Sequence, residues 1–185
     1  MKLNLGCGNK IHEGYVNVDK FDLYSVDIVH DLEKFPYPFE DNSVDEILLS
    51  HVLEHIGQES DLFIQILKEF YRISKNQALI KIAVPHPRHE DFIADPTHVR
   101  PITILGLSLF DKSLNKEWEK LGAANTPLAL IHEIDFKIEK VQYQIEDAIM
   151  QKHRSGEIDK IKLDYMMQHH NNVIKQIDIN WRVIK

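Results

Sequence analysis

The stretch LNLGCGN at positions 3–9 constrains the fold more than any other part of the chain. Leu3 and Leu5 are typical of the end of a buried strand, and Gly6 and Gly8 then end it. Glycine turns sharply at positive φ and lets the atoms of another molecule lie against its backbone. In an open α/β sheet, ligands bind in the crevice at the carboxyl ends of the strands. The stretch therefore predicts an α/β protein with a ligand site directly after its first strand.

Short apolar runs separated by polar connections predict the rest of the sheet. The predicted strands cover residues 3–5, 15–19, 27–30, 44–50, 77–84, 135–143 and 178–184. Apolar residues three and four apart predict a helix over 59–74. Strands and helices that alternate early and two late strands favour a mostly parallel sheet with an antiparallel edge strand. We expect one domain over residues 1–185, with a helical insertion at about 146–176 between the last two strands.

Composition excludes several classes of protein. The chain has 185 residues, 43% of them hydrophobic, and a formal net charge of −7. This charge, without a basic stripe, argues against a nucleic-acid partner. No apolar run is long enough to cross a bilayer, and no signal peptide precedes the first strand, so we expect no membrane partner. The single cysteine, Cys7, fits a reducing compartment, which favours a cytoplasmic location.

The glycine turn does not match a nicotinamide dinucleotide site. Such a site needs a third glycine and an acidic residue about twenty residues further on. Ile11 stands at the third glycine position, and Asp19 follows Gly8 by only eleven residues. The first connecting helix therefore has little room, and we expect it to be trimmed or absent. A short G-x-G turn can also be a tight turn with no ligand.

Acidic residues follow two further strands and point to another ligand. Asp19 ends YVNVD, and Asp31 follows DIVH. If these strands are adjacent and parallel, both carboxylates lie at the same edge as the glycine turn. A carboxylate can accept hydrogen bonds from the two hydroxyls of a ribose, and Asp31 could accept one from an exocyclic amine. The sequence contains no phosphate clamp, so a positively charged nucleoside without phosphates, such as S-adenosylmethionine, fits the site. The alternative is that Asp19 is a solvated turn residue that binds no ligand.

Four stretches resemble the class I S-adenosylmethionine-dependent methyltransferases, in particular the small members called methyltransferase type 11. In order, they are LNLGCGN, VNVD, HDLEKFPYPFEDNSVDEILLSHVLEHI and LIKIAVPHP. The resemblance implies a Rossmann-like seven-stranded sheet and S-adenosylmethionine as the cofactor. It also implies a set of residues that contact this cofactor. They are Gly6, Cys7, Gly8 and Asn9 at its methionine part, Asp19 at the ribose, Asp31 and Leu32 at the adenine, and Ser50 and His51 at the opposite side.

The loop PHPRHEDFIADPTHVRP, which follows the fifth predicted strand, holds the candidates for acceptor chemistry. Histidine exchanges protons near neutral pH, so His86 and His98 are candidate catalytic residues. Asp95 and Arg100 are candidate substrate-binding residues. The alternative is that Asp95 starts a turn and the histidines are merely solvated. No histidine spacing matches a zinc pattern, so the sequence predicts no metal site.

These patterns predict an S-adenosylmethionine-dependent methyltransferase that acts on an oxygen or nitrogen of a small, medium-sized or peptide-like acceptor. A binding or assembly protein without turnover is the main alternative, and a metal-dependent hydrolase built on the histidine-rich loop is a weaker one. With a short first connection, the cofactor site is expected to be open. The insertion at 146–176 is then either a lid or homodimer contact, or a helical hairpin packed on the sheet.

Overall fold

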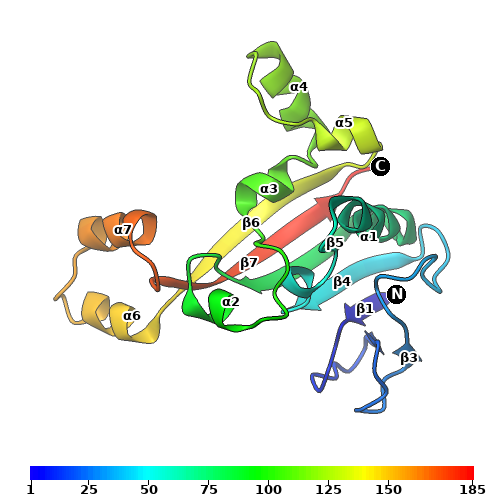
Figure 1. The fold of residues 1–185 in the computed structure, drawn as a ribbon, viewed down its shortest axis with the longest axis horizontal. Helices are drawn as coiled ribbons and strands as arrows, with labels where there is room; N and C mark the ends of the chain where they lie inside the picture. Colours follow the sequence, from blue (N-terminus) through cyan, green and yellow to red (C-terminus); the bar gives the residue numbers. More distant parts are fainter.

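The computed structural model describes residues 1–185 and contains one seven-stranded sheet in the order β3-β2-β1-β4-β5-β7-β6 (Figure 1). The strands are β1 Lys2–Leu5, β2 Val16–Asp19, β3 Ile28–Val29, β4 Val44–Ser50, β5 Ser74–Pro85, β6 Phe136–Ile145 and β7 Ile174–Val183. The strands from β3 to β5 are parallel, and β7 is antiparallel to both β5 and β6. The predicted mixed α/β sheet is confirmed. The antiparallel strand lies one place inside the edge, because β6 pairs with its outer side.

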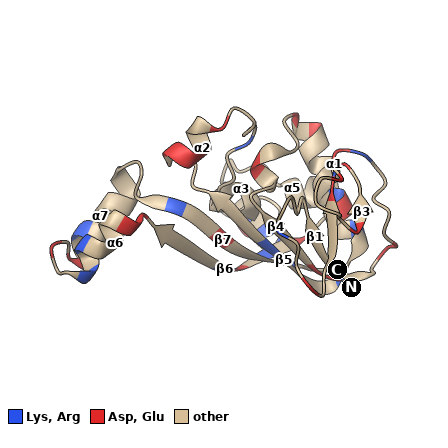
Figure 2. Cartoon of the chain, turned by 90° about the horizontal axis from the view of Figure 1, so that it is seen from below, with Lys and Arg blue, Asp and Glu red and all other residues tan.

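Helices cover only one face of this sheet (Figure 2). The helices of the chain are the 3-10 helix η1 Leu53–His55, α1 Ser60–Ile73, α2 Glu90–Ala94, α3 Ile104–Ser108, α4 Lys112–Lys120, α5 Leu128–His132, α6 Asp147–Arg154 and α7 Lys160–His169, of which α6 and α7 lie beyond the end of the sheet. Strand β7 shows the effect of this arrangement on sequence. Ile177, Ile179 and Trp181 are buried, whereas the alternate residues Asp178 and Asn180 are only half-buried. The sheet is therefore apolar toward the helices and polar on its other face.

Helix α1 forms as predicted and supplies much of the core. Phe63, Ile66, Leu67, Phe70 and Ile73 recur on one side of it and are all buried. The helix ends where Ser74 takes an extended conformation and begins β5, with the Ser74 N–H donating to the carbonyl of Phe70. The chain therefore returns from the helix to the sheet without a loop.

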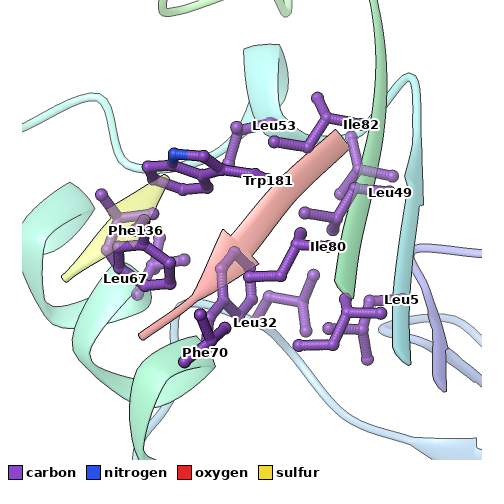
Figure 3. Close-up of a cluster of buried hydrophobic side chains, with 14 of the residues drawn as sticks. Leu5, Leu32, Leu49, Leu53, Leu67, Phe70, Ile80, Ile82, Phe136 and Trp181 are labelled. Atoms are coloured by element: carbon purple, nitrogen blue, oxygen red, sulfur yellow. The ribbon is translucent and has the colours of Figure 1, made fainter. Parts of the chain in front are cut away.

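The centre of the core is aromatic. Trp181 stacks on Phe136 with their ring centroids 4.2 Å apart, and both side chains are fully buried (Figure 3). Leu53 from η1 and Leu67 from α1 lie close to them in the same view. Because Leu53 of η1 is buried in this core, the packing holds the segment after β4 in place.

No helix connects β1 to β2, as the short spacing predicted, and none connects β2 to β3. Side chains hold these connections instead. The Asn4 amide donates to the carbonyl of Lys10 at 2.8 Å and to Asn17 Oδ1 at 2.9 Å. The Asn17 N–H in turn donates to Asp27 Oδ2 at 2.7 Å. Buried amide pairs and one carboxylate therefore fix the strand ends beside which the predicted ligand site lies.

The hairpin β6–β7 extends beyond the rest of the sheet and carries α6 and α7 near its tip (Figure 1). The Arg88 guanidinium donates to the carbonyls of Met167 and Gln168 at 2.6 and 2.7 Å and so satisfies the end of α7. These two helices occupy the segment for which an insertion was predicted. None of the helices is both long and apolar enough to cross a membrane.

Candidate functional site

A cavity of about 420 Å³ opens at the carboxyl ends of β1, β2 and β4. Six of the nine residues predicted to contact a cofactor line it. They are Gly6, Gly8, Asp19, Asp31, Leu32 and His51. The other three, Cys7, Asn9 and Ser50, do not line it. Cys7 is buried with its N–H bonded to the carbonyl of Val18, while the Asn9 side chain is exposed.

The two glycines of the turn serve different purposes. Both have positive φ, +64° at Gly6 and +50° at Gly8. A Cβ atom at Gly6 would lie 2.7 Å from Cγ2 of Val52, so glycine is required there for packing. A Cβ atom at Gly8 would meet no other atom within 4 Å. Gly8 therefore leaves open space along the backbone at the cavity, where a ligand can approach it.

One side of the cavity, called here the acidic wall, is formed by Asp19, Asp31 and Glu33. Asp19 is oriented by the backbone, because its Oδ2 accepts from the Gly8 N–H at 2.9 Å and its Oδ1 from the Phe21 N–H at 3.0 Å. Each carboxylate oxygen has a second lone pair, so Asp19 can still accept hydrogen bonds from a ligand.

Glu33 belongs to the same wall, although it was not among the residues predicted from the sequence. Its Oε1 accepts a hydrogen bond from the Gly57 N–H at 2.8 Å. This bond links the loop after β3 to the segment that follows η1. Asp31 accepts from the Glu33 N–H at 3.0 Å, which forms a tight turn. The alternation of acidic residues in HDLEK was the only sequence signal for Glu33.

A second set of residues at the cavity, called here the histidine wall, is formed by His51, Glu54, His55, Thr97 and His98. His51, His55 and Thr97 line the cavity directly. The carbonyl of Glu54 accepts from the N–H groups of the residues that follow His98, Val99 at 2.9 Å and Arg100 at 3.2 Å. This backbone pairing brings η1 and the 95–100 loop together. The histidine wall is therefore built from two segments far apart in the sequence.

His51 stands at the corner between strand β4 and η1. It has φ of +58°, a conformation that is uncommon for a residue with a side chain. Its Nδ1 lies 3.4 Å from Glu54 Oε1, and its Nε2 lies 3.0 Å from Gln176 Oε1. The neighbouring Glu54 carboxylate raises the pKa of His51, against the opposing effect of partial burial. The strained backbone aims this side chain at the cavity, as is common at functional sites.

The histidine-rich loop contributes less to the cavity than the sequence predicted. His86 does not line it; its Nδ1 accepts from the Arg88 N–H at 3.1 Å, and burial lowers its pKa. Asp95 accepts from the Thr97 N–H at 2.8 Å, which is the turn-forming role of the alternative interpretation. His98 is closer, because the adjacent Thr97 lines the cavity.

Arg100 was predicted to bind substrate but holds the local fold together. Its guanidinium donates to the carbonyl of Gly57 at 2.7 Å and lies 4.3 Å from the centre of the Phe63 ring. It borders a second cavity of about 310 Å³, which opens between α1, α3 and α5 and not toward the acidic wall. Its contacts explain its position without a ligand.

Comparison with known proteins agrees with this geometry. Residues 3–82 match the family model of the methyltransferase domain. A SAM-dependent methyltransferase from Archaeoglobus fulgidus has 18% identity and a TM-score of 0.62, over 98% of this chain and 85% of that one. One from Methanosarcina mazei has 12% identity and a TM-score of 0.55, over 100% and 92%. No curated protein sequence matches the chain significantly.

A third solved structure is the 1,6-didemethyltoxoflavin-N1-methyltransferase of Burkholderia thailandensis with bound 1,6-didemethyltoxoflavin and S-adenosylhomocysteine. It has 10% identity and a TM-score of 0.54, over 100% of this chain and 71% of that one. The strand order and these similarities define the class: the chain has the fold of the class I S-adenosylmethionine-dependent methyltransferases, and its N-terminal part matches their methyltransferase domain.

Proposed function

We propose that the protein binds S-adenosylmethionine in the cavity between the acidic and histidine walls and transfers its methyl group to an oxygen or nitrogen of a small or medium-sized acceptor. The observation that carries this proposal is the pairing of Gly8 with Asp19. Gly8 leaves its backbone open to a ligand, and its N–H holds the Asp19 carboxylate at the end of β2. The family match at residues 3–82 covers both residues.

The groups around the cavity fit this cofactor. Asp19 would accept from the ribose hydroxyls, Asp31 from the adenine amine, and Leu32 would give the adenine an apolar contact. Three carboxylates on the acidic wall and one lysine, Lys20, line the cavity. This balance disfavours a phosphate and favours a positively charged ligand. The bound cofactor supplies a methyl group on a positively charged sulfur.

The histidine wall is the side suited to the acceptor. Methyl transfer depends mainly on holding the acceptor atom in line with the methyl group. His51, His55 and Thr97 offer hydrogen-bonding groups on this wall, and a neutral imidazole can take a proton from a hydroxyl or an ammonium group. His51 and His55 line the cavity, so they replace His86 as candidates for this role. His98, behind Thr97, remains a candidate.

Calorimetric titration tests the binding part of the proposal. S-adenosylmethionine and S-adenosylhomocysteine are each titrated into the full chain, with NAD as the control ligand. We expect saturable one-to-one binding of the first two and none of NAD, because the cavity has acidic groups where a dinucleotide presents phosphates. Tight binding of NAD alone, or binding of none of the three at millimolar concentration, would contradict the proposal.

A labelled-methyl assay tests turnover. S-adenosylmethionine with a tritiated methyl group is incubated with pools of small hydroxyl and amine acceptors. Acceptor-dependent release of S-adenosylhomocysteine supports an enzyme, whereas tight cofactor binding without transfer to any pool would favour the binding protein without turnover.

A further inference from the structure

The inner part of the histidine wall contains three metal-ligating side chains that cofactor binding does not use. Glu54, His55 and His98 each place one potential ligand atom so that the three atoms lie within 4.8 Å of one another. Glu54 and His55 belong to η1, whereas His98 belongs to the loop before α3. We infer that this cluster is a binding site for one divalent transition-metal ion of the zinc type.

The state of Glu54 is the strongest argument for an ion. The residue is fully buried, and neither carboxylate oxygen has a hydrogen-bond partner. The nearest positive group, His51 Nδ1, lies 3.4 Å from Oε1, without the geometry of a hydrogen bond. A buried carboxylate without hydrogen bonds is unfavourable even beside a charged imidazole, and buried charges are normally hydrogen-bonded as well as paired, or bind metals. A metal ion between Glu54 and the two histidines would supply the missing partner.

Hydrogen bonds fix both histidines in the form that binds metal. His98 Nδ1 lies 2.7 Å from the carbonyl of Phe92, which can only accept, so Nδ1 carries the proton. His55 Nδ1 lies 2.9 Å from Thr97 Oγ1, and that hydroxyl donates to Asp95 Oδ1 at 2.6 Å. His55 Nδ1 is therefore also the donor. In both rings Nε2 keeps its lone pair, as in histidine ligands oriented by an outer hydrogen bond.

The number and type of these groups indicate which ions fit. Two imidazole nitrogens and one carboxylate suit zinc, cobalt or iron, whereas magnesium and calcium prefer oxygen ligands. Bonds of about 2.0–2.1 Å to a tetrahedral ion would draw the ligand atoms to roughly 3.4 Å from one another. Rotation of the half-buried His55 supplies most of this closure, because the His98 side chain is only 7% exposed. Three protein ligands leave one coordination position open, as in catalytic zinc sites.

The location of the cluster suggests the purpose of the open position. His55 and the adjacent Thr97 line the cavity, so the ion would border the acceptor side. If the proposed methyl transfer is correct, on which this step of the inference depends, an acceptor hydroxyl at the open position would ionise more readily. Because the ion would occupy Nε2 of His55 and His98, these rings would not take the proton; it would pass to water, and the oxygen would then be ready to accept the methyl group.

Metal titration of the full chain tests the site without reference to activity. The protein is first treated with a chelator. Co²⁺ binding is then followed by visible absorption, Zn²⁺ binding by calorimetry, and Mg²⁺ serves as the control ion. We expect one Co²⁺ or Zn²⁺ per chain and no comparable binding of Mg²⁺. At free Zn²⁺ about 100 times its Kd, the Tm should rise by roughly 5–10 °C. Absence of saturable Zn²⁺ and Co²⁺ binding would overturn the inference.

Four variants locate the bound ion. Glu54→Gln and His98→Ala remove ligands and should abolish the Co²⁺ spectrum. Thr97→Val keeps all three ligands but removes the acceptor for His55 Nδ1, together with the hydroxyl's bond to Asp95, and should weaken Zn²⁺ binding by about 10- to 100-fold. His30→Ala, at another histidine that lines the same cavity, should leave Co²⁺ and Zn²⁺ binding unchanged. Unchanged binding in Glu54→Gln and His98→Ala would mean that the ion sits elsewhere, which contradicts the inference.

Two further readouts separate this inference from misfolding and from the proposed function. Without metal, Glu54→Gln should have a higher Tm than the parent chain, since it removes a buried charge that has no hydrogen bond and only one charged neighbour, His51, at 3.4 Å. A lower Tm would show that the carboxylate is satisfied within the protein and would contradict the inference. Asp19→Ala should lose S-adenosylhomocysteine binding and keep Zn²⁺ binding, so either proposal can fail while the other stands.

Discussion

The two walls of the cavity are built by different means. The acidic wall lies at the end of β2 and directly after β3, and backbone N–H groups orient its carboxylates, as at Asp19. The histidine wall combines η1 with a loop some 43 residues later, and its members contact one another through side chains. Gly6 and Val52 touch at the boundary between the two walls. The acidic wall is thus a property of strand ends, and the histidine wall is a property of the tertiary fold.

This difference assigns different chemistry to each side. The carboxylates of the acidic wall are held by backbone N–H groups and offer hydrogen-bond acceptors in fixed positions at the ends of parallel strands. Such fixed acceptors suit the binding of a cofactor. The histidine wall carries a strained residue, His51, and a buried carboxylate without hydrogen bonds, Glu54. Strain and unsatisfied polar groups are typical of the side where chemistry occurs.

The largest effect is expected where the walls meet. Gly6→Ala should destabilise the fold by about 3 kcal/mol, since the new Cβ atom both overlaps Val52 and requires positive φ. Denaturant unfolding measures this loss. Gly8→Ala is the matched control: it has positive φ but no overlap, so it should cost only about 1 kcal/mol while weakening cofactor binding.

The double variant Gly6→Ala/Val52→Ala sharpens this test. Removing the valine methyl groups relieves the overlap and leaves the backbone strain, so the penalty of the alanine at position 6 should be smaller than in the single variant. An equal penalty in both backgrounds would contradict the close contact as the cause.

The acidic wall should respond through ligand affinity. Asp19→Ala removes charge-assisted acceptors for the ribose and should raise the Kd for S-adenosylhomocysteine by about 100-fold, measured by calorimetry. Asp22→Ala, an exposed acid three residues later that does not line the cavity, should leave the Kd unchanged. An equal effect of both variants would show that only the overall charge matters.

The loop behind the histidine wall should respond through stability. Arg100→Ala removes the hydrogen bonds to Gly57 and the contact with the Phe63 ring, and should cost about 2 kcal/mol in denaturant unfolding. Arg154→Ala, in exposed α6, is the control and should cost little. If Arg100→Ala keeps its stability but raises the KM for an acceptor, the residue binds substrate, as the sequence predicted.

The smallest effect is expected from low pH, through Asp27, which lies in the β2–β3 connection, between the acidic wall residues Asp19 and Asp31 in the sequence. Hydrogen bonds from the N–H and side-chain amide of Asn17 lower the pKa of Asp27 below its ordinary 3.8. A lowered pKa in the folded state gives stability that is present above pH 3.8 and is lost as the pH falls below it. Asp27→Asn should therefore flatten the decline in Tm below that pH. Identical acid profiles of the parent chain and the variant would contradict this assignment.

The sequence predicted the acidic wall better than the histidine wall, for a physical reason. Gly6, Gly8 and Asp19 lie at the ends of consecutive strands, so short local patterns place them together. Glu54 and His98 meet only because the Glu54 carbonyl pairs with the backbone at 99–100, which no local pattern encodes. A search for zinc-like spacing therefore could not find this cluster.

The fold shows the same limit. Apolar spacing predicted α1 and the strands, because burial on one side leaves a periodic pattern. The same patterns gave no sign that helices cover only one face of the sheet. The polar alternation of Asp178 and Asn180 in β7 records that exposure, but alternation alone also fits an edge strand. The role of Arg100 depends on Gly57, which is distant in the sequence, and the role of Asp95 depends on one hydrogen bond to Thr97. Residue type alone therefore could not distinguish a structural role from substrate binding.

A crystal structure of the full chain with S-adenosylhomocysteine tests the central claim most directly. The account predicts the ligand in the cavity between the walls, with its ribose hydroxyls on the Asp19 carboxylate and its sulfur directed toward His51 and His55. A ligand bound in the other cavity, beside Arg100 and Phe63, or one whose sulfur faces the acidic wall, would contradict the division of the site into a cofactor side and an acceptor side.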